Sequence, residues 1–238
     1  LEQQSILNAY KKDIAKYDSG NKLYLEDIFS LIPSELNNKN KRFILKDLNE
    51  NFKFSRYSNS FLWLKDAGVA LPTFCVDEPK VPLLLSRSTN LFKLFLSDVG
   101  LLAAMYAKDI QVRILNNEAD INFGSIYENA AAQELVAHGF NLFYFNSKKQ
   151  GELDFLIEDG SAVISIEIKS GKSYNKHTAL NNVMSNESYK VDKAYVFYNG
   201  NVEFKENVRY YPIYMLMFVK KEERTEDLVY KPDFSALG

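Results

Sequence analysis

The stretch GELDFLIEDGSAVISIEIKSGK, residues 151–172, decides how the second half of the chain folds. It holds two runs, 152–158 and 162–169, in which side chains of different polarity alternate. Between them stands Asp159-Gly160, a pair that is typical of tight turns. Because the side chains of a strand point alternately to opposite faces, we expect two strands that form an antiparallel pair.

The same alternation separates apolar side chains from those that carry chemistry. The three isoleucines of 162–169 share one face, which we expect to be the core face. In an antiparallel pair, Asp154 of the first run lies near Glu167 of the second. With Asp159-Gly160 as the turn, direct opposition of these two residues requires a bulge or a slip of one or two residues, so the register stays open. The residues opposite the isoleucines are Val163, Ser165, Glu167 and Lys169.

Two carboxylates a few ångströms apart repel each other unless a cation sits between them. Mg²⁺ suits this position because it takes oxygen ligands and keeps several waters, so that Asp154, Glu167 and the backbone carbonyl of Ile168 suffice. The metal lowers the pKa of a bound water and neutralises charge on a phosphate. Lys169 is then placed to orient the attacking water or to stabilise the phosphate charge. Glu128, on the inward side of the preceding predicted helix, adds a third carboxylate.

These residues also have ordinary structural interpretations. Charged alternation such as Glu167 and Lys169 is typical of a half-exposed strand. Glu128 suits the first turn of a helix, where the helix dipole favours a negative charge. It is the combination of all three with Asp154 that favours a site.

Outward from this stretch, the second half is predicted to be α/β. A strong helix is expected over 125–137, ended by Gly139, and the order is helix, three strands, helix, two strands. The remaining segments are strands at 140–146, 194–198 and 210–217 and a helix within 174–189.

The first half is predicted to be mainly helical. Three or four short helices precede two apolar runs, 69–76 and 91–96, with Gly68 at the end of the last helix. Helices followed by a two-stranded hairpin are the order of a winged helix-turn-helix, and 98–106 returns to helix. The expected earlier helices are 3–17, 24–36, 42–49 and one from Ser58 or Ser60 to Asp66.

Charge divides the chain in the same way. Residues 1–117 carry 16 basic and 13 acidic side chains, whereas 118–238 carry 13 and 18. We therefore expect two domains with these bounds. The most basic stretch, 37–56, has six basic and two acidic groups. It is either a solvated face or the phosphate-binding side of the helix-turn-helix. The residues that would contact nucleic acid are Lys46, Lys53, Arg56, Tyr57 and Asn59.

Composition excludes several classes of protein. The net charge of −2 argues against a uniformly basic, histone-like binder. The single cysteine, Cys75, excludes an internal disulfide and fits a cytoplasmic location. Two histidines argue against a His-built metal site. No apolar run reaches about 18 residues, so no membrane contact is expected. The chain lacks an initial Met and opens within a predicted helix, which suggests a fragment of a longer protein.

Asp154, followed after a gap of 12 residues by Glu-x-Lys at 167–169, resembles the PD-(D/E)XK nuclease superfamily. IYENAAAQEL, GELDFLIE and SIEIKSGK further resemble the C-terminal domain of a prokaryotic family of AAA+-type P-loop ATPases. FLWLKDAGVA and NLFKLFLSDVGLLAAM resemble that family's winged helix and the joining segment. The likeness covers about residues 5–218, although Leu153 stands where the superfamily often has Pro.

This resemblance implies a winged helix followed by a restriction-endonuclease-like αβββαβ domain. It implies a catalytic set of Glu128, Asp154, Glu167 and Lys169, with Mg²⁺ held by Asp154 and Glu167. In that family an ATPase module comes first, so the resemblance implies such a module in the full-length protein. No G-x-x-x-x-G-K-[ST] motif occurs in the present chain, so ATP is expected to bind only through that module.

Three functions remain open. The first is a Mg²⁺-dependent nuclease that a winged helix guides to nucleic acid, with DNA favoured. The second is a DNA-binding or regulatory module without catalysis. The third is a protein-interaction domain of the ATPase, in which an aromatic surface near the C-terminus contacts the partner. That partner could be a second copy of the chain, in a homo-oligomer. The residues of that surface would be Tyr210, Tyr211, Tyr214 and Phe218.

Overall fold

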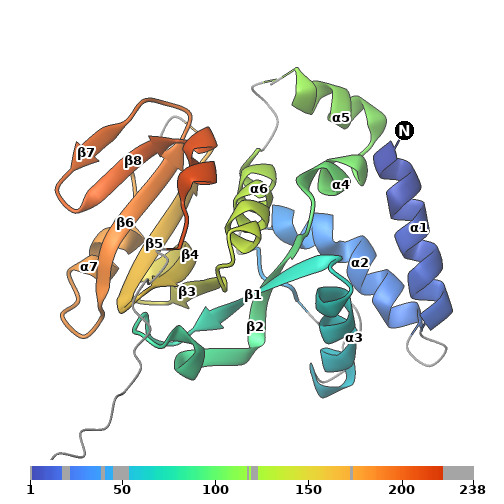
Figure 1. The fold of residues 1–238 in the computed structure, drawn as a ribbon, viewed down its shortest axis with the longest axis horizontal. Helices are drawn as coiled ribbons and strands as arrows, with labels where there is room; N and C mark the ends of the chain where they lie inside the picture. Colours follow the sequence, from blue (N-terminus) through green and yellow to red (C-terminus); the bar gives the residue numbers. More distant parts are fainter. Residues whose placement is uncertain are drawn as a thin grey trace, which may run out of the picture.

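A single eight-stranded sheet runs through both halves of the chain, and the helices of the first half gather at one end of it (Figure 1). The α/β class predicted from the sequence is therefore confirmed. The structure is a computed structural model, and it describes residues 2–17, 22–38, 41–44, 54–116, 118, 123–171 and 174–221. Within these residues, no helix combines the length and the apolar character needed to cross a membrane.

The first three helices pack on one another and against the hairpin that follows them. They are α1 (Glu2–Tyr17), α2 (Lys22–Asn37) and α3 (Phe54–Asp66), and each buries apolar residues on the face that it turns to the others. Helix α3 is followed by Gly68 at φ 67°, the left-handed conformation that favours glycine after a helix. The expected helical character of these segments is confirmed.

The hairpin of β1 (Ala70–Val76) and β2 (Arg87–Leu96) does not stand apart as a wing. Strand β1 also pairs in parallel with β3 (Phe143–Ser147), so its backbone groups are satisfied on both sides by the sheet. The strand order is β2-β1-β3-β4-β5-β6-β8-β7. The other strands are β4 (Gly151–Asp159), β5 (Ala162–Lys169), β6 (Val191–Tyr198), β7 (Glu203–Lys205) and β8 (Val208–Pro212).

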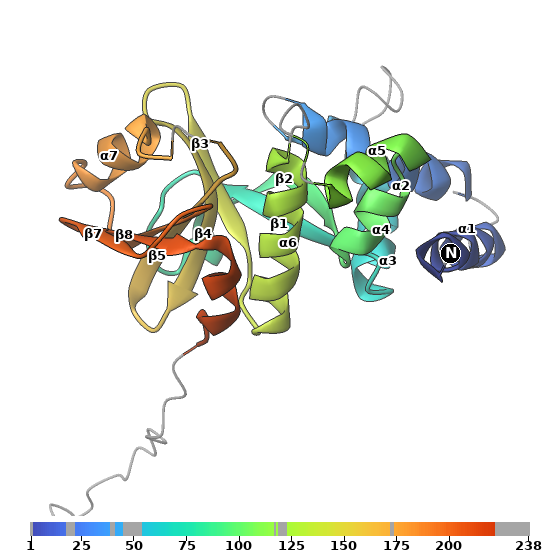
Figure 2. The same ribbon diagram turned by 90° about the horizontal axis from the view of Figure 1, so that it is seen from above.

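Helices cover both faces of the central strands. Helix α6 (Gly124–Ala137) packs on one face and α7 (Thr178–Met184) on the other, as Figure 2 shows. The isoleucines of β5 face α6, as expected, but Val163 and Ser165 on the opposite face are also fully buried. The alternative of a solvated strand face therefore does not hold for these two residues, because α7 covers this face.

Some predicted elements differ from those observed. Residues 42–44 of the expected 42–49 helix are not helical, because Phe43 N–H donates to the carbonyl of Phe92 on β2 (2.9 Å). Residues 45–49 lie outside the described part. The expected strand 210–217 is divided: β8 ends at Pro212, and a 3-10 helix, η3 (Ile213–Phe218), follows. Further short helices are η2 (Leu83–Ser86), α4 (Val99–Ala104) and α5 (Lys108–Leu115).

One buried amide connects α6 to the N-terminal hairpin. The side chain of Asn129 accepts a hydrogen bond from Leu96 N–H (2.8 Å) and donates one to the Leu96 carbonyl (2.9 Å). Asn129 is fully buried, so water does not replace these bonds if the amide is lost. The pair fixes the height of α6 relative to β2.

We predict that Asn129→Ala lowers the free energy of unfolding by about 2–4 kcal/mol, because two backbone groups of Leu96 lose their partners in the interior. Urea denaturation followed by circular dichroism measures this loss. The matched control is Asn141→Ala at an exposed position, which should change stability by no more than about 0.5 kcal/mol. Equal effects of the two substitutions would contradict the assigned role.

Candidate active site

The candidate site begins with the register of β4 and β5. The two strands pair from Asp159↔Ala162 to Phe155↔Ile166, with Gly160-Ser161 as the turn. Asp154 and Glu167 come next after the last of these pairs, and the amide of Asp154 contacts the side chain of Glu167. The turn predicted at Asp159-Gly160 lies one residue nearer the N-terminus than the observed turn. The bulge or slip expected between these two strands is absent from their paired residues.

A bulge does occur on the other side of β4. Phe143 of β3 pairs with Leu156, but Phe145 pairs with Leu153, so two steps along β3 match three along β4. The extra residue lies between Leu153 and Leu156, and both leucines pack on the α7 face. Bulges of this kind redirect side chains, and here the bulged stretch contains Asp154.

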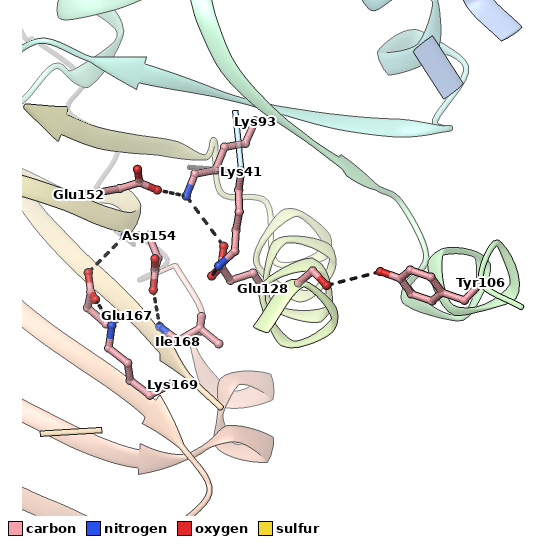
Figure 3. A network of polar contacts seen from close by, with 10 residues as sticks. Lys41, Lys93, Tyr106, Glu128, Glu152, Asp154, Glu167, Ile168 and Lys169 are labelled. Atoms are coloured by element: carbon pink, nitrogen blue, oxygen red, sulfur yellow. Dashed lines mark hydrogen bonds and ion pairs between the residues drawn. The ribbon is translucent and has the colours of Figure 1, made fainter. Parts of the chain in front are cut away.

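Four groups meet at this point, as Figure 3 shows. The amide of Asp154 donates to Glu167 Oε1 (3.2 Å), and the amide of Ile168 donates to Asp154 Oδ2 (2.9 Å). The ammonium of Lys169 donates to Glu167 Oε2 (2.8 Å). The carboxylate of Glu167 thus contacts the Lys169 ammonium and the Asp154 backbone, and the Asp154 carboxylate contacts the Ile168 backbone. None of the hydrogen bonds among the described residues uses Asp154 Oδ1.

Burial sets the charge of these groups. It raises the pKa of Glu167 to about 7, and the charge of Asp154 adds to the rise, while the Lys169 ammonium opposes it. Burial by itself lowers the pKa of Lys169, but the carboxylates of Glu167 and Asp154 outweigh it and raise that pKa above its ordinary value. Lys169 therefore stays an ammonium, whereas Glu167 exchanges a proton near neutral pH.

Glu128 reaches the same region from α6, buried on one side of the helix with Ala132 and Leu135 as predicted. Its Oε1 is bound by the ammonium of Lys41, and its Oε2 lies 3.9 Å from Nζ of Lys93. Burial and the charge of Asp154 raise the pKa of Glu128, and the two lysines lower it. Both oxygens of the expected third carboxylate thus face lysines of the N-terminal half.

Lys93 is the least expected member of this cluster. Its side chain is 0% exposed, Nζ lies 2.7 Å from Glu152 Oε1, and the ammonium stands 5.0 Å from the centre of the Tyr144 ring. Burial lowers the pKa of Lys93, but the charges of Glu128, Glu152 and Asp154 raise it above its ordinary value. A lysine is almost never fully buried without such partners.

The donor set suits a single divalent cation. Glu128, Glu152, Asp154 and Glu167 bring four carboxylates, and Lys41, Lys93 and Lys169 bring three ammonium groups, so one negative charge is in excess when all are ionised. Among the described residues, no group of three or more His, Cys, Asp or Glu side chains is arranged to hold an ion. A site for Mg²⁺ here would have Asp154 and Glu167 as its carboxylate ligands, with waters completing the shell, which is a usual arrangement for this ion.

The predicted nucleic-acid contacts are less well placed. Lys46 and Lys53 lie outside the described residues, and the structure describes the backbone of Arg56 but not its side chain. Tyr57 is fully buried, with its ring 5.1 Å from that of Tyr24 in an edge-to-face contact. Its assignment to the nucleic-acid surface is therefore wrong, because α3 turns this ring into the core. Asn59 is exposed on α3.

Three members of the cluster were not identified from the sequence. Lys93 stands alone in the apolar run LFKLFL (91–96), and a lone charge in a buried strand is a sign of an internal partner. Glu152 lies on β4 two residues before Asp154. Lys41 was read as part of a basic surface, and no pattern in the sequence connects it to Glu128, 87 residues away.

Comparison with protein families gives two matches, neither of which covers half of the chain. Residues 2–113 match the family described as Domain of unknown function (DUF8612), and residues 123–216 match Domain of unknown function (DUF4143). Neither the search of curated proteins nor the search of solved structures gave a match. Glu128, Asp154, Glu167 and Lys169 fall in the DUF4143 match, and Lys41 and Lys93 in the DUF8612 match.

Proposed function

We propose that this chain is the C-terminal part of an AAA+-type ATPase and that its second half hydrolyses phosphodiester bonds of nucleic acid, with DNA favoured, using Mg²⁺. The observation that carries the proposal is the contact of Glu167 with both the Asp154 amide (3.2 Å) and the Lys169 ammonium (2.8 Å) at the ends of two paired strands. The DUF4143 match supports the ATPase connection, because this domain is common at the C-termini of AAA ATPases.

In this proposal, Asp154 and Glu167 would hold the cation. Asp154 is only half-buried and is already oriented by the Ile168 amide through Oδ2, so that Oδ1 is left for a ligand. When bound, Mg²⁺ supplies a water of lowered pKa and neutralises charge on the phosphate. Glu167, which exchanges its proton near pH 7, is ionised when it binds a cation.

Lys169 contributes charge rather than proton abstraction. Its raised pKa keeps it protonated at neutral pH, so it does not serve as a general base. As an ammonium 2.8 Å from Glu167 it is positioned to donate hydrogen bonds to a phosphate oxygen or to the attacking water. This role is electrostatic stabilisation of the negative charge that builds up on the phosphate.

We predict that the wild-type chain cleaves plasmid or oligonucleotide DNA in the presence of Mg²⁺ or Mn²⁺. Asp154→Ala and Lys169→Ala should each lower the rate by about 100-fold or more, because the first removes a cation ligand and the second removes a charge that stabilises the transition state. Gel electrophoresis of the products over time measures the rate. The matched controls are Asp192→Ala and Lys193→Ala, exposed residues of β6. Equal cleavage by all five proteins would rule out this site.

Cation binding should depend on pH through Glu167. The pKa of Glu167 is raised to about 7, so below that pH a proton must leave before the cation binds, and above it the carboxylate is already charged. We predict that the Kd for Mn²⁺ falls by about tenfold for each unit by which the pH rises toward neutrality, and that it stays constant at higher pH. Isothermal titration calorimetry over this range measures Kd. Glu167→Gln should bind weakly and lose the dependence; an unchanged pH profile in that variant would contradict the assignment.

A non-catalytic module is the second candidate function. The pairing of Glu128 with Lys41 and Lys93 favours it, because a carboxylate expected to serve a cation is neutralised by the protein itself. In this case the basic stretch 37–56 binds DNA, or an aromatic surface binds a protein. Of the aromatic residues expected there, Tyr214 and Phe218 are largely exposed, whereas Tyr210 is in the core. Phe218 also borders a cavity of about 280 Å³ with Tyr195, Tyr211 and Lys193.

DNA binding through the basic stretch has its own test. We predict that duplex DNA binds at low salt, that the affinity falls steeply as salt increases, and that Lys53→Glu or Arg56→Glu weakens binding and flattens the salt dependence. Fluorescence anisotropy with a labelled duplex measures this. The control is Lys108→Glu on α5, an exposed lysine outside 37–56. An absence of binding at low salt would exclude this mode of recognition.

A further inference from the structure

The charged cluster is built by both halves of the chain. Glu128 on α6 is approached by Lys93 from β2 and by Lys41 from the segment 41–44, as Figure 3 shows. The two lysines lie in the DUF8612 match and the carboxylates in the DUF4143 match. The site therefore crosses the gap between the two family matches, and neither match alone contains all of its charges.

The two lysines differ in their freedom to move. Lys93 is fully buried and paired with Glu152, so it is a fixed part of the interior. The Lys41 side chain is 22% exposed and stands at the edge of the cluster. The Lys41 ammonium can therefore leave Glu128 without any opening of the core.

The backbone around Lys41 holds its ammonium in place. Phe43 is hydrogen-bonded to Phe92 of β2 (2.9 Å), and the amide of Ile44 donates to Glu35 Oε2 of α2 (2.8 Å). Lys41 itself has φ 46°, a left-handed conformation that costs free energy for a residue with a Cβ. A strained backbone fixed at two points delivers this ammonium to Glu128 Oε1.

We propose that Lys41 is a positioning residue that acts as a built-in counter-ion of Glu128. It keeps this carboxylate away from a divalent cation and leaves Asp154 and Glu167 as the carboxylate ligands. The site then takes one cation, and Lys41 of the N-terminal half sets the affinity of the site for that cation. The inference rests on the proposed function, since it concerns the cation that Asp154 and Glu167 hold. Lys93 lies 3.9 Å from the other oxygen of Glu128.

The test is the affinity of the whole chain for Mn²⁺, measured by isothermal titration calorimetry. Lys41→Met keeps the length of the side chain but removes a positive charge and frees an oxygen of Glu128. We expect the Kd to fall on the order of tenfold, because repulsion of the cation is lost. Lys41→Arg, which keeps the charge, should retain the wild-type Kd. The double variant Lys41→Met with Glu128→Gln removes one positive and one negative charge, so the net charge of the site is unchanged. Its Kd should therefore return close to the wild-type value.

A merely structural role of Lys41 gives the opposite sign, because a loosened site binds the cation more weakly. The matched control is Lys80→Met, which removes a surface lysine paired with Glu78 (2.9 Å) and should leave the Kd unchanged. Wild-type binding of one Mn²⁺ that Lys41→Met fails to strengthen would overturn this inference and leave the proposed function intact. If the wild-type chain shows no Mn²⁺ binding that Asp154→Ala abolishes, the proposed function is refuted, and the inference with it.

Discussion

The candidate site depends on the two-residue turn at Gly160-Ser161, because this turn sets the register of β4 against β5. In that register the amide of Asp154 contacts Glu167, and the amide of Ile168 is free to bind the Asp154 carboxylate. A slip of one residue would carry every side chain of one strand to the opposite face of the sheet and so separate the two carboxylates. The packing of isoleucines under α6 excludes that slip, so the apolar core and the acidic pair specify each other.

The second constraint is the charge cluster between the two halves. Buried ion pairs contribute little net stability, since the cost of desolvating the charges offsets their attraction, and apolar residues of similar size often do as well. Stability alone therefore does not account for a fully buried Lys93 between Glu128 and Glu152. The arrangement does hold Glu128 and Glu152 on either side of one ammonium, and the proposed function gives their charges a role beside the cation.

The parts of this structure that follow from strand alternation and helical spacing could be predicted from the sequence. Alternation identified β4 and β5, the helical stripe placed Glu128 with Ala132 and Leu135, and Gly68 marked the end of α3. The sequence did not reveal the parts that depend on contacts distant in sequence. The parallel pairing of β1 with β3 draws the expected wing into the common sheet. Tyr57 is turned inward by the way α3 packs against α2, and Lys41 and Lys93 reach Glu128 only in the folded chain.

The central claim is that Asp154 and Glu167 bind one divalent cation between them. The most direct test is a crystal grown with Mn²⁺ and measured at a wavelength where manganese scatters anomalously. The account predicts a single anomalous peak at about 2.0–2.6 Å from an oxygen of Asp154 and an oxygen of Glu167, with Glu128 still bound to Lys41. A site without a peak at saturating Mn²⁺, or a peak held by Glu128 and Glu152 instead, would contradict it.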